Sequence, residues 1–199
     1  MKIISIKQKQ SRNSCLLAND FLFPVEGAHI NLTLKSLTGW QECHRSFYKS
    51  PFDFSILKRF CNGTQLLLGC RSLETPDLLT LAGIGQFDDV FQPCLPKQCS
   101  NNRKSSKKLK KSNCTNSFQC ITKAKRGVGW YNANNQTLGF VRGSLSFTVS
   151  PCDSSELDAD YRLCWTSQSQ SKNEHTDRCG KAVNLHNSSK WERVIYSMT

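Results

Sequence analysis

Eleven cysteines, spread along 199 residues, constrain this chain more than any other feature. This is about twice the usual share of cysteine. None of them forms a C-x-x-C pair, the spacing typical of zinc knuckles and thioredoxin-like redox sites. A dispersed set favours disulfides in an oxidising compartment over metal ligands. Because the number is odd, one thiol is free, pairs with another chain, or pairs with a cysteine outside this sequence.

Glycosylation motifs point to the same compartment. Five N-x-[S/T] acceptors stand in polar, loop-like surroundings: Asn31, Asn62, Asn113, Asn135 and Asn187. They are typical of a glycosylated ectodomain if the host is a eukaryote. Against this, residues 1–10 lack the apolar run of a signal peptide. No run of eighteen apolar residues occurs, so no transmembrane segment is predicted. We expect an extracellular or cell-surface location, with no signal peptide visible in this chain.

Positive charge is concentrated in one segment. The formal net charge is +12, and ten lysines and arginines without any acid lie between residues 96 and 127. A second acid-free basic stretch occupies residues 1–12, which leaves the rest of the chain close to neutral. We therefore predict a flexible basic leader at 1–27 and a single β-rich domain at 28–197. Within that domain, residues 94–120 form a basic insertion loop that cysteines close at its base.

Short apolar runs and polar–apolar alternation predict a mainly β fold. Alternation at 29–35 predicts a half-buried strand with Ile30, Leu32 and Leu34 inward and Asn31 outward. Further strands are predicted at 65–70, 77–84, 127–131, 137–141, 144–149, 161–165 and 191–197, with another beginning near 88. The pattern predicts a disulfide-stabilised β-sandwich or a compact, barrel-like pair of sheets.

One short helix is predicted near 51–61. Ser50 suits the N-cap and Pro51 the first helical position. Phe52, Ile56 and Phe60 follow at intervals of four, which places them on one stripe facing the core.

The lysine-rich loop is a candidate polyanion site through Lys107, Lys108, Lys110 and Lys111. Nucleic-acid binding is disfavoured, because no aromatic residue for base stacking occurs between residues 92 and 117. The alternative is a solvated loop whose like charges repel one another.

Other residues suggest chemistry only weakly. Asp153, Glu156, Asp158 and Asp160 carry oxygen ligands at short intervals, but without the glycine pivot or terminal glutamate of an EF-hand, so a polar loop is favoured over calcium. His175 and Cys179 would share a face only on a helix, which their surroundings do not favour. Cys43 and His44 are adjacent, so their side chains diverge. We predict no metal site, no cofactor and no catalytic set, which favours a non-enzymatic protein.

Four tryptophans have two interpretations: Trp40, Trp130, Trp165 and Trp191. They could line a sugar-binding surface by stacking, or pack in the core around disulfides. Packing is the favoured interpretation, because all four lie in segments predicted to be ordered.

Several motifs together resemble an uncharacterised domain of secreted bacterial proteins. They are G-W-Q-E-C at 39–43, L-L-G-C-R at 67–71, G-V-G-W-Y at 127–131, Y-R-L-C-W at 161–165, R-C-G at 178–180 and W-E-R-V-I-Y at 191–196. The resemblance covers residues 28–197, with 94–120 as an insertion. It implies an exported domain with a disulfide framework of Cys43, Cys61, Cys70, Cys152, Cys164 and Cys179. It also implies that the insertion cysteines Cys94, Cys99, Cys114 and Cys120 pair among themselves, which leaves Cys15 as the odd one.

The function these observations favour is a secreted or cell-surface binding or adhesion module, with carbohydrate as the first ligand class and an extracellular protein as another. A secreted hydrolase or toxin-like effector with an unrecognised site is the alternative. A basic protein that binds polyanions or nucleic acid is the third hypothesis.

Overall fold

The computed structural model describes residues 24–92, 95–96, 118–119, 127–133, 137–142, 151–152, 159–167 and 177–199. The predicted mainly β fold is confirmed, and the two main antiparallel sheets do not close into a barrel. Eleven strands are described, in the order β1 Gly27–Thr33, β2 Gln41–Phe47, β3 Gln65–Ser72, β4 Leu78–Gln86, β5 Leu95–Pro96, β6 Phe118–Gln119, β7 Val128–Ala133, β8 Thr137–Arg142, β9 Arg162–Thr166, β10 Arg178–Cys179 and β11 Trp191–Met198. The helices are α1 Phe54–Phe60 and α2 Phe87–Val90, with 3₁₀ turns η1 Leu34–Ser36, η2 Ala159–Tyr161 and η4 Leu185–Asn187.

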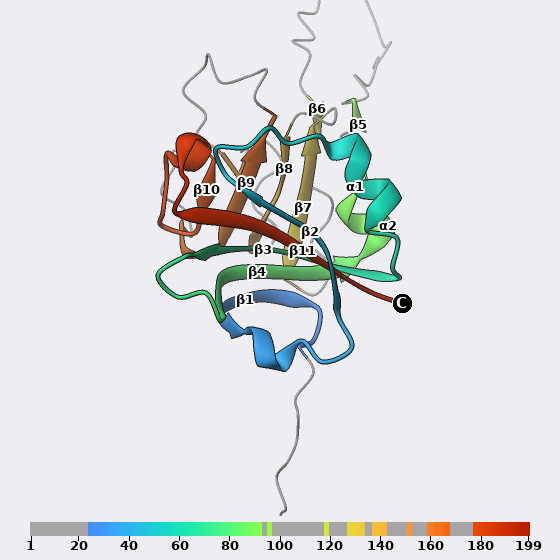
Figure 1. The fold of residues 1–199 in the computed structure, drawn as a ribbon. Coiled ribbons are helices and arrows are strands. Elements are labelled where there is room, and N and C mark those ends of the chain that lie inside the picture. The colour runs from blue at the N-terminus through green and yellow to red at the C-terminus, as the bar shows by residue number, and fades with distance from the viewer. Residues whose placement is uncertain are drawn as a thin grey trace, which may run out of the picture.

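The larger sheet has the order β1-β4-β3-β11-β2 and the smaller sheet has the order β10-β9-β8-β7. The closing strand β11 lies inside the larger sheet, antiparallel to both of its neighbours, so that Val194 is opposite Gly69 of β3 and Arg45 of β2. In Figure 1 the strands of the smaller sheet cross those of the larger one steeply, and both figures place α1 and α2 at the same end of the molecule. The strand β11 is therefore an interior strand of the larger sheet, next to the edge strand β2.

The core between the sheets depends on two glycines. Gly83 and Gly85 are two residues apart in β4 and both lie on its inner face, opposite aromatic rings from the smaller sheet. A Cβ atom on Gly83 would come within 2.6 Å of the Phe140 ring, and one on Gly85 within 2.6 Å of the Trp130 ring. Since real Cβ atoms do not approach so closely, the two rings occupy the space that these glycines leave free.

A second, smaller core lies on the outer face of the larger sheet. The segment that joins β1 to β2 folds under this face, as Figure 1 shows for η1 and the loop after it. Leu37 and Trp40 of this segment pack against Leu67, Val194 and Tyr196 of the sheet. We call residues 34–40 the strap, because they cover an apolar sheet face that solvent would otherwise wet.

The helix near 51–61 begins later than predicted. Asp53 is its N-cap, and the Asp53 carboxylate accepts hydrogen bonds from the Ser55 amide at 2.8 Å and hydroxyl at 2.7 Å. A carboxylate at this position satisfies free amides of the first turn, so Ser50 is not the cap. The predicted stripe is also wrong, because the helix buries Phe54 and Leu57 and leaves Ile56 and Phe60 exposed.

Two strand predictions also need correction. Residues 87–90 form the helix α2, and Asp88 and Asp89 occupy its first turn, where acids suit the helix dipole. At 29–35, β1 ends at Thr33, and Leu34 begins η1. Asn31 is exposed as predicted, but its backbone has φ 56° and Ile30 is exposed. The left-handed residue interrupts the simple alternation of the strand.

The six cysteines of the described part form three disulfides. Cys70–Cys179 joins β3 of the larger sheet to β10 of the smaller sheet, and its half-cystines are 109 residues apart. Cys43–Cys61 joins the edge strand β2 to the end of α1. Cys152–Cys164 joins β9 to the turn at 151–152. Cys15 and the four insertion cysteines lie outside the described residues, as does the predicted strand at 144–149.

The ends of the basic insertion lie together. Residues Leu95–Pro96 pair with Phe118–Gln119 as the short antiparallel sheet β5-β6. The loop between them, with its four candidate lysines, lies outside the described residues.

Candidate functional site

Arg193 is the centre of a buried polar cluster on the inner face of the larger sheet. Its guanidinium carbon lies 4.7 Å from the ring centroid of Phe52 and 5.2 Å from that of Tyr48. Its Nη2 atom donates hydrogen bonds to three backbone carbonyls, those of Phe47, Tyr48 and Ser50. A planar cation suits this arrangement, because it can stack on aromatic rings and donate at its edge. Arg193 thereby fixes the chain that leads from β2 to α1.

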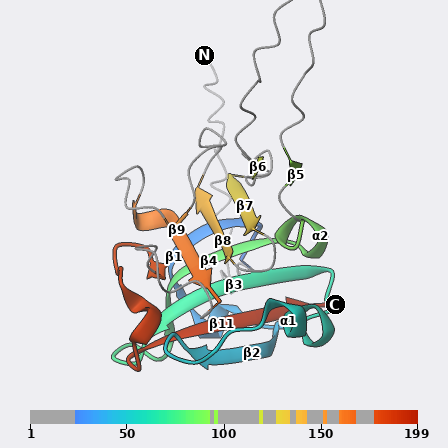
Figure 2. The ribbon, with the colours of Figure 1, turned by 90° about the horizontal axis from the view of Figure 1, so that it is seen from above.

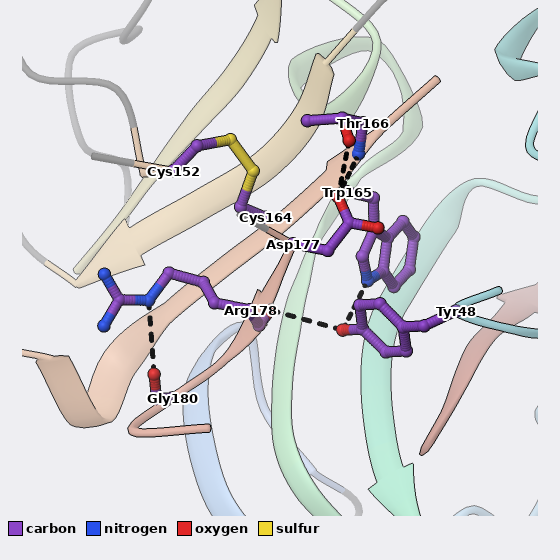
Figure 3. The surroundings of a disulfide bond; sticks show 8 residues. All are labelled: Tyr48, Cys152, Cys164, Trp165, Thr166, Asp177, Arg178 and Gly180. Atoms are coloured by element: carbon purple, nitrogen blue, oxygen red, sulfur yellow. Dashed lines mark hydrogen bonds between the residues drawn. A yellow bond between two sulfur atoms is a disulfide. The ribbon is translucent and has the colours of Figure 1, made fainter. Parts of the chain in front are cut away.

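A second set of buried groups extends this cluster to the smaller sheet. The Tyr48 hydroxyl accepts a hydrogen bond from Trp165 Nε1 at 2.9 Å and donates one to the Arg178 carbonyl at 3.2 Å. Asp177 accepts hydrogen bonds from the Thr166 amide and hydroxyl, both at 2.7 Å. Figure 3 shows Tyr48 pointing toward Trp165 and Arg178, with the Cys152–Cys164 disulfide nearby. These bonds hold β10 and the loop after β2 against β9.

Burial shifts the pKa values of three groups in this cluster toward their neutral forms, because desolvation disfavours the charged form. Desolvation raises the pKa of Asp177, although the Thr166 hydrogen bonds and the charge of Arg193 oppose the shift. Desolvation also raises the pKa of Tyr48. The pKa of His44 is lowered, first by burial and then by Arg193. His44 contacts Ser46 Oγ at 3.0 Å, and its neighbour Cys43 is a half-cystine, so this pair is not a nucleophile and base.

The outer face of the larger sheet carries a separate row of charges. Arg71 Nε and Glu192 Oε2 form a buried ion pair at 2.7 Å, and Arg71 Nη1 also donates to the Pro76 carbonyl at 2.7 Å. Further along, the Tyr196 hydroxyl donates to Glu42 Oε2 at 3.0 Å. Desolvation, followed by the charge of Glu42, raises the pKa of Tyr196 to about 12. Acids and bases alternate in this row, so it does not attract ligands of one sign.

Sequence reasoning did not single out either cluster. The signal was present, because Glu192 and Arg193 are adjacent charges inside an otherwise apolar strand. Adjacent residues of a strand point to opposite faces. Such a pair indicates that the strand buries one charged side chain on each face of the sheet. This is expected of an interior strand that has a core on both faces.

The tryptophans follow the core-packing interpretation. Trp40, Trp130 and Trp165 are buried, and Trp191 is half-buried against the main core. They therefore provide no exposed aromatic platform for a sugar.

The acidic and histidine candidates are not brought together in the described part of the chain. Asp160 forms an exposed ion pair with Lys181 at 3.0 Å, whereas residues 153–158 and His175 lie outside the described residues. Cys179 is a half-cystine. Within the described ranges, no group of three histidine, cysteine or acidic residues could hold a metal ion.

Three of the five glycan acceptors can be placed. Asn31, Asn62 and Asn187 are all exposed, on β1, after α1 and at the end of η4 respectively. Asn113 and Asn135 lie outside the described residues. The three described acceptors are thus accessible in the folded domain.

A groove of about 510 Å³ lies at the end of the larger sheet where β3 begins and β11 ends. Its lining combines polar and apolar residues without an ionisable side chain: Pro24, Val25, Thr38, Gly39, Gln65, Met198 and Thr199. Its volume is in the range of small-ligand sites. The side chains of the lining offer hydroxyl and amide groups for hydrogen bonds and apolar surface for contact, but no carboxylate, basic group or thiol.

No helix in the described ranges is long and apolar enough to cross a membrane. No family model, curated protein or solved structure matches the chain. The resemblance to a domain of secreted bacterial proteins therefore gains no support from these comparisons.

Proposed function

We propose that this chain is an extracellular, disulfide-stabilised binding domain whose ligand occupies the groove between the strap and the end of the larger sheet. The groove is the observation that carries the proposal. It combines a ligand-sized volume with a lining that contains no ionisable side chain. Such a lining favours binding over acid–base or nucleophilic catalysis.

The extracellular part of the proposal is supported by the disulfides. Disulfides persist in oxidising compartments and are rare where glutathione keeps thiols reduced. All six cysteines in the described ranges are paired, and one of the pairs spans the two sheets. The exposed acceptors Asn31, Asn62 and Asn187 are consistent with this compartment.

The ligand class that fits the lining is neutral, with polar and apolar surfaces, and a short oligosaccharide meets this description. The Thr38 hydroxyl can donate to or accept from sugar hydroxyls, and the Gln65 side-chain carbonyl can accept from them while its amide donates to Glu26. Val25 and Met198 can contact the C–H groups of the sugar. The buried tryptophans do not contribute. Recognition in the groove would therefore depend on shape and hydrogen bonds rather than on aromatic stacking.

The first experiment is a count of free thiols by mass spectrometry on denatured protein, with and without reductant. The proposal predicts that no peptide containing one of the six described cysteines carries a free thiol before reduction. Ten or eleven free thiols would contradict the extracellular part of the proposal.

The second experiment tests the groove with a matched pair of variants on the oxidised protein. Val25 is 72% exposed and lines the groove, whereas Val183 is 45% exposed and lies outside its lining. We expect a neutral oligosaccharide from a glycan array to bind the wild type, and Val25→Arg to weaken that binding by tenfold or more. Val183→Arg should bind as the wild type does. Absence of any bound glycan, or equal loss in both variants, would contradict carbohydrate binding in this groove.

A further inference from the structure

Five residues that begin with the last residue of α1 alternate strictly between exposed and buried side chains. Phe60, Asn62 and Thr64 are exposed, while Cys61 and Gly63 are buried. Contacts with β2 and β11 hold the two buried residues, Cys61 and Gly63, in place. The chain cannot rotate at these residues without breaking the contacts.

These contacts are specific. Cys61 is bonded to Cys43 of β2. Gly63 lies so close to the backbone of Met198 that a Cβ atom would collide with it, and the Thr64 amide donates to the Met198 carbonyl at 2.7 Å. Cys61 also has a non-helical backbone, with φ −109° and ψ 72°. The chain around Asn62 is therefore held on both sides, by the Cys61 disulfide before it and by the Gly63–Thr64 bend after it.

Phe60 and Asn62 are the exposed residues on either side of the buried Cys61. Two residues separated by a single residue have Cα atoms at most about 7 Å apart, so Phe60 and Asn62 are neighbours on the surface. Asn62 and Thr64 are the acceptor and the hydroxyl of a glycosylation motif. Phe60 is thus an exposed aromatic residue two positions before the acceptor.

Phe60 also leaves an apolar surface uncovered. Its side chain is 65% exposed, and Ile56, one helical turn earlier, is 45% exposed. The two side chains leave apolar area in contact with water that a neighbouring group can cover. The nearest group that the sequence can add to this surface is a sugar on Asn62.

We propose that Asn62 carries an N-linked glycan whose first N-acetylglucosamine packs against the Phe60 ring. In the transfer, Asn62 Nδ2 forms a bond to sugar C1 as it loses a proton. The bond from C1 to the diphosphate of a lipid-linked oligosaccharide donor breaks, and the lipid diphosphate leaves. The C–H face of the pyranose and its acetyl methyl group then cover the aromatic ring, which removes apolar area from water.

The other four acceptors lack this arrangement. The residues two positions before them are His29, Lys111, Ala133 and Leu185. Of these, Leu185 is buried and His29 is half-buried, whereas Lys111 and Ala133 lie outside the described residues. Phe60 is thus the one Phe, Tyr or Trp residue that precedes an acceptor at this spacing. Asn187 is an internal control for a glycan without an aromatic partner.

This inference rests on the proposed extracellular location, and the test separates the two. The full chain is expressed behind an appended signal sequence in a eukaryotic secretory host, and occupancy at Asn31, Asn62 and Asn187 is measured by mass spectrometry. Thermal unfolding is then compared for wild type, Phe60→Ala, Asn62→Gln and the double variant. The same four proteins are also made without glycans in an oxidising bacterial compartment.

We expect Asn62 to be occupied and each single substitution to lower Tm by about 3 °C in the glycosylated set. The double variant should lose little more than either single variant, because both substitutions remove one contact. This non-additivity should be absent from the unglycosylated set. Asn187→Gln combined with Phe60→Ala should be additive in both sets, as should Ile56→Ala combined with Asn187→Gln.

Two outcomes would overturn the inference alone. One is an unoccupied Asn62 in an oxidised protein whose other acceptors are occupied. The other is additive effects of Phe60→Ala and Asn62→Gln in the glycosylated set. Binding of the unoccupied protein to anionic vesicles, lost in Phe60→Ala, would assign the ring to a membrane surface instead. A reduced protein with no occupied acceptor would overturn the proposed extracellular function as well.

Discussion

Glu192 and Arg193 are neighbours on β11, yet they lie in two differently built regions of the molecule. Glu192, on the outer face of the sheet, neutralises Arg71 directly at 2.7 Å. Arg193, on the inner face, is held by backbone carbonyls and two aromatic rings. The inner face is also tied to the smaller sheet by Cys70–Cys179. One strand thus stabilises two interfaces by different means, a charge pair on the outer face and a cation–aromatic cluster beside a disulfide on the inner face.

The largest expected effect comes from the covalent tie. Replacing both Cys70 and Cys179 by Ala removes a disulfide whose half-cystines are 109 residues apart. Because this disulfide restricts the unfolded chain, its loss should lower the free energy of unfolding by about 4 kcal/mol. Replacing Cys43 and Cys61, which are 18 residues apart, should cost about 3 kcal/mol. Urea unfolding under non-reducing conditions, followed by tryptophan fluorescence, measures both. A smaller loss for the longer closure would mean that the inner interface does not depend on its disulfide.

On the outer face, Glu192→Ala should cost about 3 kcal/mol, because it leaves the buried Arg71 without its counter-charge. Arg45→Ala is the matched control, since the Glu42–Arg45 pair is partly exposed and such pairs contribute about 0.5 kcal/mol. This variant leaves the hydrogen bond between Tyr196 and Glu42 in place. Combining Arg71→Met with Glu192→Leu should recover much of the loss. If Glu192→Ala behaves like Arg45→Ala, the outer ion pair does not stabilise the sheet.

On the inner face, Arg193→Lys should cost about 2 kcal/mol even though it keeps the charge. An ammonium group cannot stack flat on Tyr48 and Phe52 while donating to three carbonyls. The comparison with Arg71→Lys, whose partner is a carboxylate, sharpens the contrast, and the loss there should be smaller. Denaturant unfolding of the oxidised proteins gives both values, and equal losses would remove the distinction between the two faces.

Asp177 gives the inner cluster a dependence on pH. Its pKa is raised in the folded state, so the native state holds this proton to a higher pH than the unfolded chain does. The contribution of Asp177 to the free energy of unfolding is therefore largest below the pKa of an unfolded aspartate, about 3.9. This contribution is lost as pH rises through the raised pKa of Asp177 in the folded state. The free energy of unfolding of wild type minus that of Asp177→Asn should fall between pH 4 and pH 7. A flat difference would contradict the shift.

The contribution of His44 to the free energy of unfolding should change with pH in the opposite direction to that of Asp177. We expect this effect to be the smallest of those predicted here. Its pKa is lowered in the folded state by burial and Arg193, so the unfolded chain binds the proton first. Stability is lost as pH falls below about 6.5 and through the lowered folded value. The difference between wild type and His44→Gln should therefore decrease from pH 7 to pH 5. The same unfolding series on both variants tests the two signs together.

The fold class of this protein could be predicted from local sequence patterns. Dispersed cysteines, alternating apolar positions and short strands were enough to predict a mainly β, disulfide-stabilised fold with one short helix, because these patterns reflect local geometry and composition. Local capping was harder to predict. Ser50 and Asp53 are both good N-caps, and only the packing of Phe54 and Leu57 decided where α1 begins.

The contacts between distant segments could not be predicted from the sequence, because they depend on the order of the strands in the sheets. Because β11 inserts between β3 and β2, Glu192 meets Arg71 and Arg193 meets Phe52, contacts between residues more than a hundred positions apart. The groove likewise joins Val25, Gln65 and Met198 from three distant segments. The physical reason is that the alternation of residues along a strand determines on which side of the sheet a side chain lies. The order and register of the strands determine which residues of other strands lie beside it there.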